Sequence, residues 1–314
     1  MKDKTASAGG HVPVLLEPVL RGLNIRPDGC YVDGTFGRGG HSSAILKLLG
    51  SNGRLLAIDR DPQALAAVAP ALKGDPRFEV IKGEIAELKE YALERNLLGK
   101  VDGLLLDLGV SSPQLDEARR GFSFRADGPL DMRMDPTTGI SAADWLATVD
   151  EKILKKVLAE FGEEKQAARI ARGIVAARSS RSMTRTAELA DLIAAMLPAR
   201  GRRKHPATKT FQAIRIFINQ ELKQLQAALE ASIELLCPGG RLCVISFHSL
   251  EDRCVKRFMR NASREPEQYR GLPEIPADMR PPLKLIGKMI SASDAEIDAN
   301  IRARSARLRI AERL

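Results

Sequence analysis

The fold is decided by one glycine-rich stretch, Cys30-Tyr31-Val32-Asp33-Gly34-Thr35-Phe36-Gly37-Arg38-Gly39-Gly40-His41. A short apolar run ends there in Asp33, passes through the glycine turn, and leads into a helical pattern over about 42–49. A strand, a glycine-rich turn and a helix in this order are typical of the start of a nucleotide-type binding site. Glycines have no Cβ, so the backbone of the turn can approach a ligand closely.

A second strand pattern, residues 54–58, ends in Asp59. An acidic residue at this place, roughly 20 residues after the turn, can accept hydrogen bonds from both ribose hydroxyls. Asp33 stands just before the turn, where a carboxylate repels a pyrophosphate but suits a cationic amino acid. We therefore expect Asp33, Gly37 and Asp59 to bind S-adenosylmethionine (SAM), which has a ribose, an ammonium and a sulfonium. The alternatives are a dinucleotide ligand, and a turn that merely packs a helix on a sheet.

Strand patterns at 77–81 and 101–107, separated by a helical pattern over 86–96, continue the alternation. Such alternation predicts an α/β fold, a Rossmann-like parallel sheet with helices on both faces. The next strand pattern, 241–247, follows only after about 130 residues, too many for one crossover. We expect a flexible tail at 1–10, a SAM-binding domain formed by 11–114 and 211–314, and an inserted helical subdomain for substrate binding at 115–210.

Within the insertion, the sequence predicts helices over 142–158, 164–178 and 186–197. A long amphipathic stripe from Ile214 to Leu236, with apolar residues at three- and four-residue spacing, predicts one helix that docks on the sheet. Near the carboxyl end, 282–286 is predicted as a late strand. The basic segment 303–314 is expected to be mobile or to fold over the substrate.

The composition excludes several classes of protein. Of the 314 residues, 44% are hydrophobic, but the longest apolar runs are strand-sized, so no membrane span is expected. The first ten residues lack the apolar core of a signal peptide. The four cysteines form no CxxC pair and the four histidines are scattered, so we expect neither a metal site nor disulfides. These features favour a cytoplasmic protein with buried thiols; a homodimer is compatible with the sequence.

Positive charge is concentrated in the insertion. The formal net charge is +9, and between Glu163 and Lys209 eleven Lys and Arg residues stand against four acids. Clustered positive charge suits a polyphosphate partner, because each neutralised phosphate releases counterions. An ordinary solvated basic face is the alternative. The RNA clamp that we predict here consists of Arg178, Arg181, Arg185, Arg202, Arg203 and Lys204.

Five separate motifs occur in order along the chain: Asp33-Gly34-Thr35-Phe36-Gly37-Arg38-Gly39-Gly40-His41-Ser42, Leu106-Asp107-Leu108-Gly109-Val110-Ser111-Ser112-Pro113-Gln114, Arg120-Gly121-Phe122-Ser123-Phe124, Gly128-Pro129-Leu130-Asp131-Met132-Arg133-Met134 and Ser246-Phe247-His248-Ser249-Leu250-Glu251-Asp252-Arg253. Together they resemble the ribosomal small-subunit methyltransferase H family (RsmH, also called MraW). The resemblance covers nearly the whole chain from His11.

The resemblance implies a SAM-dependent enzyme that methylates N4 of a P-site cytidine in 16S rRNA of the small ribosomal subunit. It also implies SAM contacts from the glycine turn and from the ends of strands. Carried over to this sequence, the positions that match are Gly39, Gly40, His41, Asp59, Asp107 and Gln114. The position that is often aromatic in the family is Ile85, which would cover the adenine as an apolar lid rather than by ring stacking.

An exocyclic cytosine amine is a poor nucleophile, so methyl transfer needs it in line with the sulfonium methyl and needs acceptors for its protons. The loop after strand 101–107 lacks the Pro-Pro-aromatic sequence of other amino-methyltransferases. We therefore expect backbone carbonyls or hydroxyls around Ser111 and Ser112 to orient the amine, with Asp107 as a further catalytic candidate besides its role toward SAM. His248 is a candidate base contact or proton acceptor, with a structural hydrogen bond as the alternative. Rival functions are a DNA amino-methyltransferase, an oxidoreductase and a non-catalytic SAM-binding ribosome assembly factor.

Overall fold

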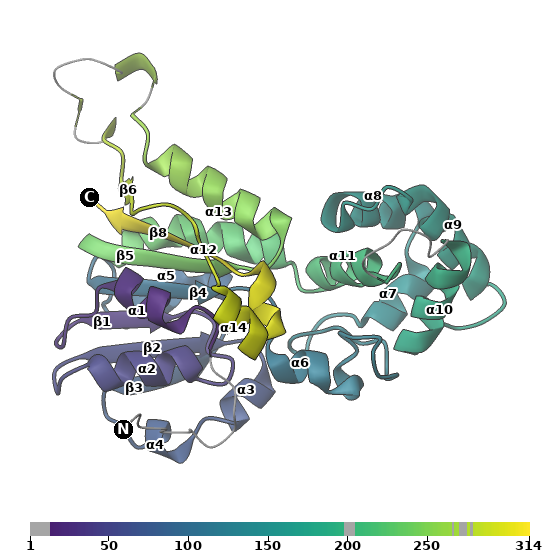
Figure 1. The fold of residues 1–314 in the computed structure, drawn as a ribbon, viewed down its shortest axis with the longest axis horizontal. Coiled ribbons are helices and arrows are strands. Elements are labelled where there is room, and N and C mark those ends of the chain that lie inside the picture. Colours follow the sequence, from purple (N-terminus) through teal and green to yellow (C-terminus); the bar gives the residue numbers. More distant parts are fainter. Residues whose placement is uncertain (1–12, 198–204, 266, 270–274, 277–278) are drawn as a thin grey trace. The chain divides into compact units, whose positions relative to one another are not determined.

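The computed structural model describes residues 13–197, 205–265, 267–269, 275–276 and 279–314. The predicted flexible tail at 1–10 lies outside the described residues. The chain divides into two compact units (Figure 1): Met1–Gly109 with Lys223–Leu314, and Val110–Leu222. The second unit extends beyond the 115–210 of the predicted insertion at both ends.

The first unit is built on a mixed sheet. Among the described residues its strands follow the order β3-β2-β1-β4-β5-β8-β6, with β7 beside β8. Strands β1 to β5 run parallel, and β8 runs antiparallel to β5, β6 and β7. The strand bounds are Cys30–Asp33 (β1), Arg54–Asp59 (β2), Phe78–Lys82 (β3), Val101–Asp107 (β4), Leu236–Ser246 (β5), Leu283–Leu285 (β6), Ile290–Ser291 (β7) and Arg307–Arg313 (β8). The Rossmann-like α/β fold predicted from the alternating patterns is confirmed.

Both faces of the sheet are buried, because alternate residues of the central strands enter different cores. Leu105 belongs to one hydrophobic cluster, while Leu104 and Leu106 belong to the other. The first cluster takes in apolar residues of helices α1 and α2, and the second those of α5, α12 and α13. Side chains that alternate along a strand point to opposite faces, so near-continuous apolar strands require helices on both sides.

The helices of the first unit cover these faces and include short 3₁₀ turns. Their bounds are Leu16–Leu23 (α1), Gly40–Leu48 (α2), Pro62–Ala66 (α3), Pro70–Lys73 (α4), Ile85–Glu87 (η1), Leu88–Glu94 (α5), Glu221–Leu235 (α12, which begins in the second unit), Ser249–Ala262 (α13), Glu267–Tyr269 (η3), Asp294–Ala299 (α14) and Ile301–Ser305 (η5).

The second unit is helical and has its own core. Its elements are Ser112–Asp116 (α6), Ala118–Arg120 (η2), Ala142–Thr148 (α7), Glu151–Gly162 (α8), Ala167–Arg178 (α9), Thr186–Met196 (α10) and Thr208–Ile218 (α11). Trp145, Leu158, Ile170 and Ile193 are among the buried residues that bring four of these helices together. The predicted helix over 142–158 is in fact two helices, because the Asp150 carboxylate accepts the Lys152 N–H at 2.7 Å and caps a new start.

The single long helix predicted from Ile214 to Leu236 is also wrong. The chain breaks between α11 and α12, where Gln220 has a φ of +50°. Asn219 stabilises the break: its amide donates to the Met132 carbonyl at 2.7 Å, and its Oδ1 accepts the Met134 N–H at 2.7 Å. Apolar residues of α11 therefore enter the helical core, and only those of α12 pack on the sheet.

The carboxyl-terminal segment is a strand of the sheet rather than a mobile basic tail. In β8, Leu308 and Ile310 enter the core, while Arg307 and Arg309 alternate with them. Both arginines donate to the buried Asp252 on α13, at 2.9 and 2.8 Å. Although burial raises the pKa of Asp252, the hydrogen bonds from Arg309 and Arg307 hold it below the usual value. Alternation with period two, rather than the charge, was the informative signal.

None of the helices in the described ranges has the length and apolar character needed to cross a membrane. The four cysteines are free thiols. The expectation that all four are buried holds for Cys243, whereas Cys30, Cys237 and Cys254 are partly exposed.

Candidate functional site

The glycine-rich turn is held in place by the carboxylate that precedes it. Asp33 is 1% exposed and accepts hydrogen bonds from the Thr35 N–H at 3.1 Å and from the Ser42 hydroxyl at 2.6 Å. The Thr35 hydroxyl in turn accepts the N–H of Asp107 at 2.7 Å. Burial raises the pKa of Asp33, and the hydrogen bonds from Ser42 and Thr35 oppose that rise. Asp33 thus ties the turn to α2, and Thr35 ties it to the end of β4.

The turn needs glycine at particular positions. Gly37 and Gly39 have φ values of +55° and +73°, which L-residues other than glycine rarely adopt. A Cβ on Gly39 would also lie 2.7 Å from the ring of Phe36. Gly40 has a different constraint, because a Cβ there would overlap Pro13.

Asp59, at the carboxyl end of β2, fixes the other side of the turn. Its Oδ2 accepts the Gly37 N–H at 2.7 Å and its Oδ1 accepts the Asp61 N–H at 2.8 Å. Burial raises the pKa of Asp59 to about 6, against the lowering effect of these two hydrogen bonds. Each carboxylate oxygen can accept a second hydrogen bond, so these contacts leave acceptor capacity for a ribose.

Asp107 and His41 bring polar atoms without hydrogen-bond partners to the same place. Asp107 Oδ1 is buried without a partner in the described chain, and Oδ2 lies 3.6 Å from His41 Nε2. Burial, with the negative charges of Asp33 and Glu251, raises the pKa of Asp107 to about 8. Burial lowers the pKa of His41 to about 4, and neither ring nitrogen makes a hydrogen bond of good geometry among the described residues. At neutral pH, His41 is therefore uncharged and cannot neutralise Asp107.

Ile85 lies beside the turn, at the start of η1. A Cβ placed on Gly34 would be 2.7 Å from Leu106 Cδ2 and 3.4 Å from Ile85 Cγ2. Ile85 is only partly buried. The structure thus puts an apolar, partly exposed side chain next to the glycine turn.

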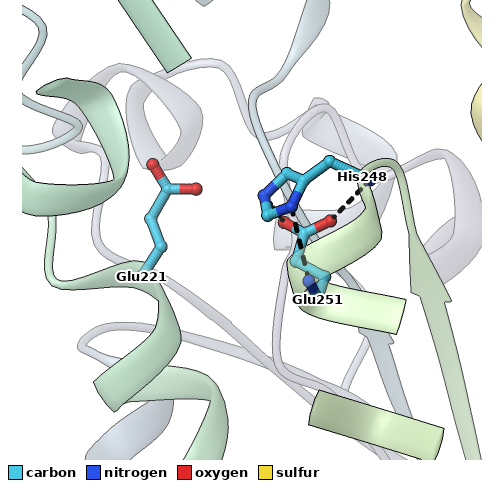
Figure 2. A group of neighbouring side chains, drawn as sticks. All are labelled: Glu221, His248 and Glu251. Atoms are coloured by element: carbon cyan, nitrogen blue, oxygen red, sulfur yellow. Dashed lines mark hydrogen bonds and ion pairs between the residues drawn. The ribbon is translucent and has the colours of Figure 1, made fainter. Parts of the chain in front are cut away.

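His248 caps α13 together with Glu251 (Figure 2). The His248 Nδ1 accepts the Glu251 N–H at 3.3 Å, and Glu251 Oε2 accepts the N–H groups of Phe247 and His248 at 2.8 and 3.2 Å. The His248 Nε2 lies 3.1 Å from Glu251 Oε1. The third residue drawn, Glu221, forms an ion pair with Arg215 at 2.7 Å.

Glu251 is not among the site residues predicted from the sequence, although its charge contributes to the raised pKa of Asp107. An acid three residues after a helix N-cap is the signature of a capping box, and that local signal indicates only that Glu251 caps the start of α13.

Ser111, Ser112 and Gln114 belong to the second unit, at the start of α6. Gln114 is 5% exposed, and its Oε1 accepts the Ser111 N–H at 2.9 Å in a capping box. The side-chain oxygen of Gln114 thus holds the helix start, and Ser111 is the N-cap residue.

The predicted RNA clamp is only partly described, since Arg202, Arg203 and Lys204 lie outside the described residues. Arg178 donates to the carbonyls of Leu146 and Val149 at 3.0 and 2.6 Å, so it closes the end of α7. Arg181 and Arg185 are exposed, but they form ion pairs with Glu188 and Asp127 at 2.6 and 2.5 Å.

The family model described as the MraW methylase family matches residues 8–314. The chain is also similar to solved structures. A candidate rRNA methylase from Clostridium thermocellum is 11% identical, with a TM-score of 0.45 over 97% of this chain and 98% of that chain. An rRNA methylase from Streptococcus thermophilus is 12% identical, with a TM-score of 0.42 over 95% and 93%. TrmN from Thermus thermophilus is 12% identical, with a TM-score of 0.43 over 96% and 48%. The family match includes both compact units.

Proposed function

Because the chain belongs to the MraW methylase family, a family of SAM-dependent methyltransferases, we propose that it methylates N4 of a P-site cytidine in 16S rRNA. The substrate in this proposal is the small ribosomal subunit, and the reaction takes place in the cytoplasm, where subunits are assembled. Methyl transfer from SAM follows from the family; the RNA, the nucleotide and its position are the proposal.

One observation carries the assignment of the site. Asp33, Asp59 and Asp107 meet around the glycine turn, where the charge of Asp33 contributes to the raised pKa of both Asp59 and Asp107. His41, which lies 3.6 Å from Asp107, is uncharged at neutral pH. A group of acidic side chains that lacks a cationic partner among the described residues favours a cationic ligand and disfavours a pyrophosphate. SAM, with its ammonium and sulfonium, fits this site better than a dinucleotide.

The residues present also fit the parts of SAM. Gly37 and Gly39 bring backbone close to the ligand, and Asp59 is the acceptor for the ribose hydroxyls. Asp107, whose buried Oδ1 lacks a partner among the described residues, would hold the ammonium. Ile85 would cover the adenine. Three further residues would support the site indirectly in this proposal. Asp33 holds the glycine turn against α2, and Gly40 allows close packing against Pro13. Gln114 holds the start of α6.

The cytosine amine must be oriented and relieved of a proton, because its lone pair is delocalised into the ring. Bound SAM supplies an electrophilic methyl group. The chain would supply acceptors for the amine protons, for which Ser111, Ser112 and the backbone around Val110 are our candidates. If Ser111→Ala and Ser112→Ala both leave kcat unchanged, hydroxyls have no part in this step.

A single substitution separates the two roles considered for His248. Asparagine is a good N-cap residue and has no basic ring nitrogen. If His248 only caps α13, His248→Asn keeps both stability and turnover. If it accepts a proton or orients the base, kcat falls while the melting temperature is retained. The ring already accepts the Glu251 N–H, which supports the capping role.

The substrate-binding role of the insertion remains our proposal and is tested by charge. Reversal of Arg181 and Arg185, which are 72% and 50% exposed, should weaken binding to the subunit and leave SAM affinity unchanged. Each reversal also breaks an ion pair within the insertion, so Glu188→Gln and Asp127→Asn serve as controls that break the same pairs without adding negative charge. An unchanged affinity and salt dependence in the reversal variants would remove these arginines from the proposal.

The experiment is methyl transfer from labelled SAM to small subunits isolated from cells that lack this protein. Free rRNA and duplex DNA are assayed beside them, and the products are digested to nucleosides. We expect label in N4-methylcytidine. Label in DNA would favour a DNA amino-methyltransferase, and SAM binding without transfer would favour a SAM-binding assembly factor.

A further inference from the structure

Helix α13 has a strongly basic exposed face in the first unit. Its acids Glu251 and Asp252 are buried at its start. The cations that follow recur at three- and four-residue spacing and are all exposed: Arg253, Lys256, Arg257, Arg260 and, just beyond the helix, Arg264. Residues at this spacing share one helix face. With a rise of about 1.5 Å per residue, the row from Arg253 to Arg264 is about 16 Å long.

A cavity of about 250 Å³ lies beside this row. Its cationic lining is Lys256 and Arg260 of α13, Lys288 of the β6–β7 connection, and Arg309 of β8. The rest of its lining is apolar and includes Met259, Ile286 and Met289. The cavity thus combines apolar and cationic lining residues, and none of the described residues that line it is acidic.

Four of the cations on this surface are not engaged within the described protein. In the part of the chain that the structure describes, Lys256, Arg257, Arg260 and Lys288 make no ion pair and no side-chain hydrogen bond. Arg309 is different, because it is held by Asp252. The described arginines of the predicted clamp are engaged within their own unit, whereas the α13 face has cations available for a partner.

We propose that this surface, formed by α13 and the β6–β7 connection, binds the phosphate backbone of an unpaired RNA segment. Phosphates would contact Lys256, Arg260 and Lys288, and a sugar or base would cover the apolar residues that line the cavity. The inference rests on the proposed function, since it adds a second contact of the methyltransferase with its RNA. It assigns RNA binding to the first unit, outside the helical insertion.

Charge and exposed apolar area both favour RNA over other partners. The exposed large apolar residues beside the cations are Leu285 and Met289, 46% and 38% exposed, an area too small to anchor a membrane. Protein–protein interfaces are depleted in Lys, and two of the four unpaired cations on this surface, Lys256 and Lys288, are lysines. An extended polyphosphate chain is the partner that matches the unpaired cations Lys256, Arg257, Arg260 and Lys288.

The test compares two triple variants of the full-length protein. The first is Lys256→Ala with Arg260→Ala and Lys288→Ala. The control, Lys47→Ala with Lys73→Ala and Lys100→Ala, removes the same charge from exposed positions elsewhere in the first unit. Binding to small subunits and to 16S rRNA is measured as a function of salt concentration, and SAM binding is measured by calorimetry as a check on folding.

The slope of log K against log salt is negative, and loss of three phosphate contacts should make it shallower by about 2, at roughly 0.7 for each phosphate of a single strand. If the first variant and the wild type bind RNA equally at about 1 M salt, this change in slope corresponds to an affinity about 50-fold lower for the variant at about 0.15 M. The control should retain the wild-type slope, and both variants should retain SAM affinity. KM for subunits should rise in the first variant, with kcat unchanged.

An unchanged slope and affinity in the first variant would overturn the inference, as would an equal loss in the control. Unchanged RNA affinity with lost binding to vesicles of acidic phospholipid would assign the surface to a membrane instead. These results differ from a failure of the proposed function, in which the wild-type protein transfers no methyl group to cytidine although its salt-dependent binding can still be measured.

Discussion

SAM binding should release a proton from Asp107. In the cofactor-free protein the pKa of this carboxyl is raised to about 8, so it is mostly protonated at neutral pH. A cationic ligand favours the carboxylate, and the proton must leave when SAM binds. The affinity for SAM should therefore increase as the pH rises toward 8.

The size of this effect follows from the pKa. With a pKa of about 8 in the free protein and an ionised carboxylate in the complex, affinity should rise roughly 25-fold between about pH 6 and pH 7.5. Asp107→Asn cannot titrate. The ratio of the two proteins' affinities therefore cancels every other titrating group, the amine of SAM included.

Calorimetry in buffers of different ionisation enthalpy measures both the affinity and the proton release. A ratio of wild-type to Asp107→Asn affinity that stays constant across this pH range, or the same proton release in both proteins, would refute the reasoning.

The pH dependence of stability gives an independent check. The folded protein holds a proton that the unfolded chain releases above about pH 4, so wild-type stability falls as the pH rises from there to 8. Asp107→Asn should remove that fall and raise the melting temperature of the cofactor-free protein at pH 7.5.

Three further substitutions test the surrounding structure. Gly39→Ala and its control Gly99→Ala both place a Cβ at positive φ, which costs about 1–2 kcal/mol of stability. Of the two, only the Cβ at position 39 would lie within 3 Å of an aromatic ring, that of Phe36. Only Gly39→Ala should therefore weaken SAM binding tenfold or more, as measured by calorimetry. Glu251→Ala removes the buried carboxylate that accepts two partly buried N–H groups, and it should lower the free energy of unfolding by about 2–3 kcal/mol in urea. Glu265→Ala, at an exposed position, should change it by less than about 0.5 kcal/mol. Asp252→Ala should lower the free energy of unfolding by about 2 kcal/mol at pH 7. The arginine partners lower the pKa of Asp252, so the stability that this carboxylate contributes is present above about pH 4 and is lost as the pH falls through the lowered pKa. The free energies of unfolding of the variant and the wild type should therefore converge in acid.

The parts of the fold that the sequence predicts well depend on local patterns. Strand 101–107 is confirmed as β4 because its apolar run and its final acid are both local signals. The glycine turn is equally local, since positive φ at Gly37 and Gly39 is a property of the turn itself. Both faces of the sheet are covered, as continuous apolar strands require.

The errors occur where distant residues decide the structure. An apolar stripe of constant spacing runs through Asn219 and Gln220, and only the contacts of Asn219 with a loop about 85 residues away end α11 there. The strand β8 was missed because its arginines dominate the composition, although their partner Asp252 allows them to lie against α13.

The candidate site shows the same limit. That Asp33, Asp59 and Asp107 end neighbouring strands could be predicted from sequence. That the Thr35 hydroxyl accepts the Asp107 N–H, and that Glu251 lies near enough to raise the pKa of Asp107, could not, because both depend on the packing of β4 and α13.

The proposed N4 methylation of one cytidine in the small subunit is tested most directly by locating the methyl group. Purified protein and SAM would be incubated with small subunits from cells that lack the protein, and nuclease fragments of the 16S rRNA would be analysed by mass spectrometry. We predict a single methyl group, on N4 of one cytidine at the P site, that is absent when SAM is omitted. A methyl group on another base, on a carbon or ribose oxygen of cytidine, or none at all with SAM bound, would contradict the account.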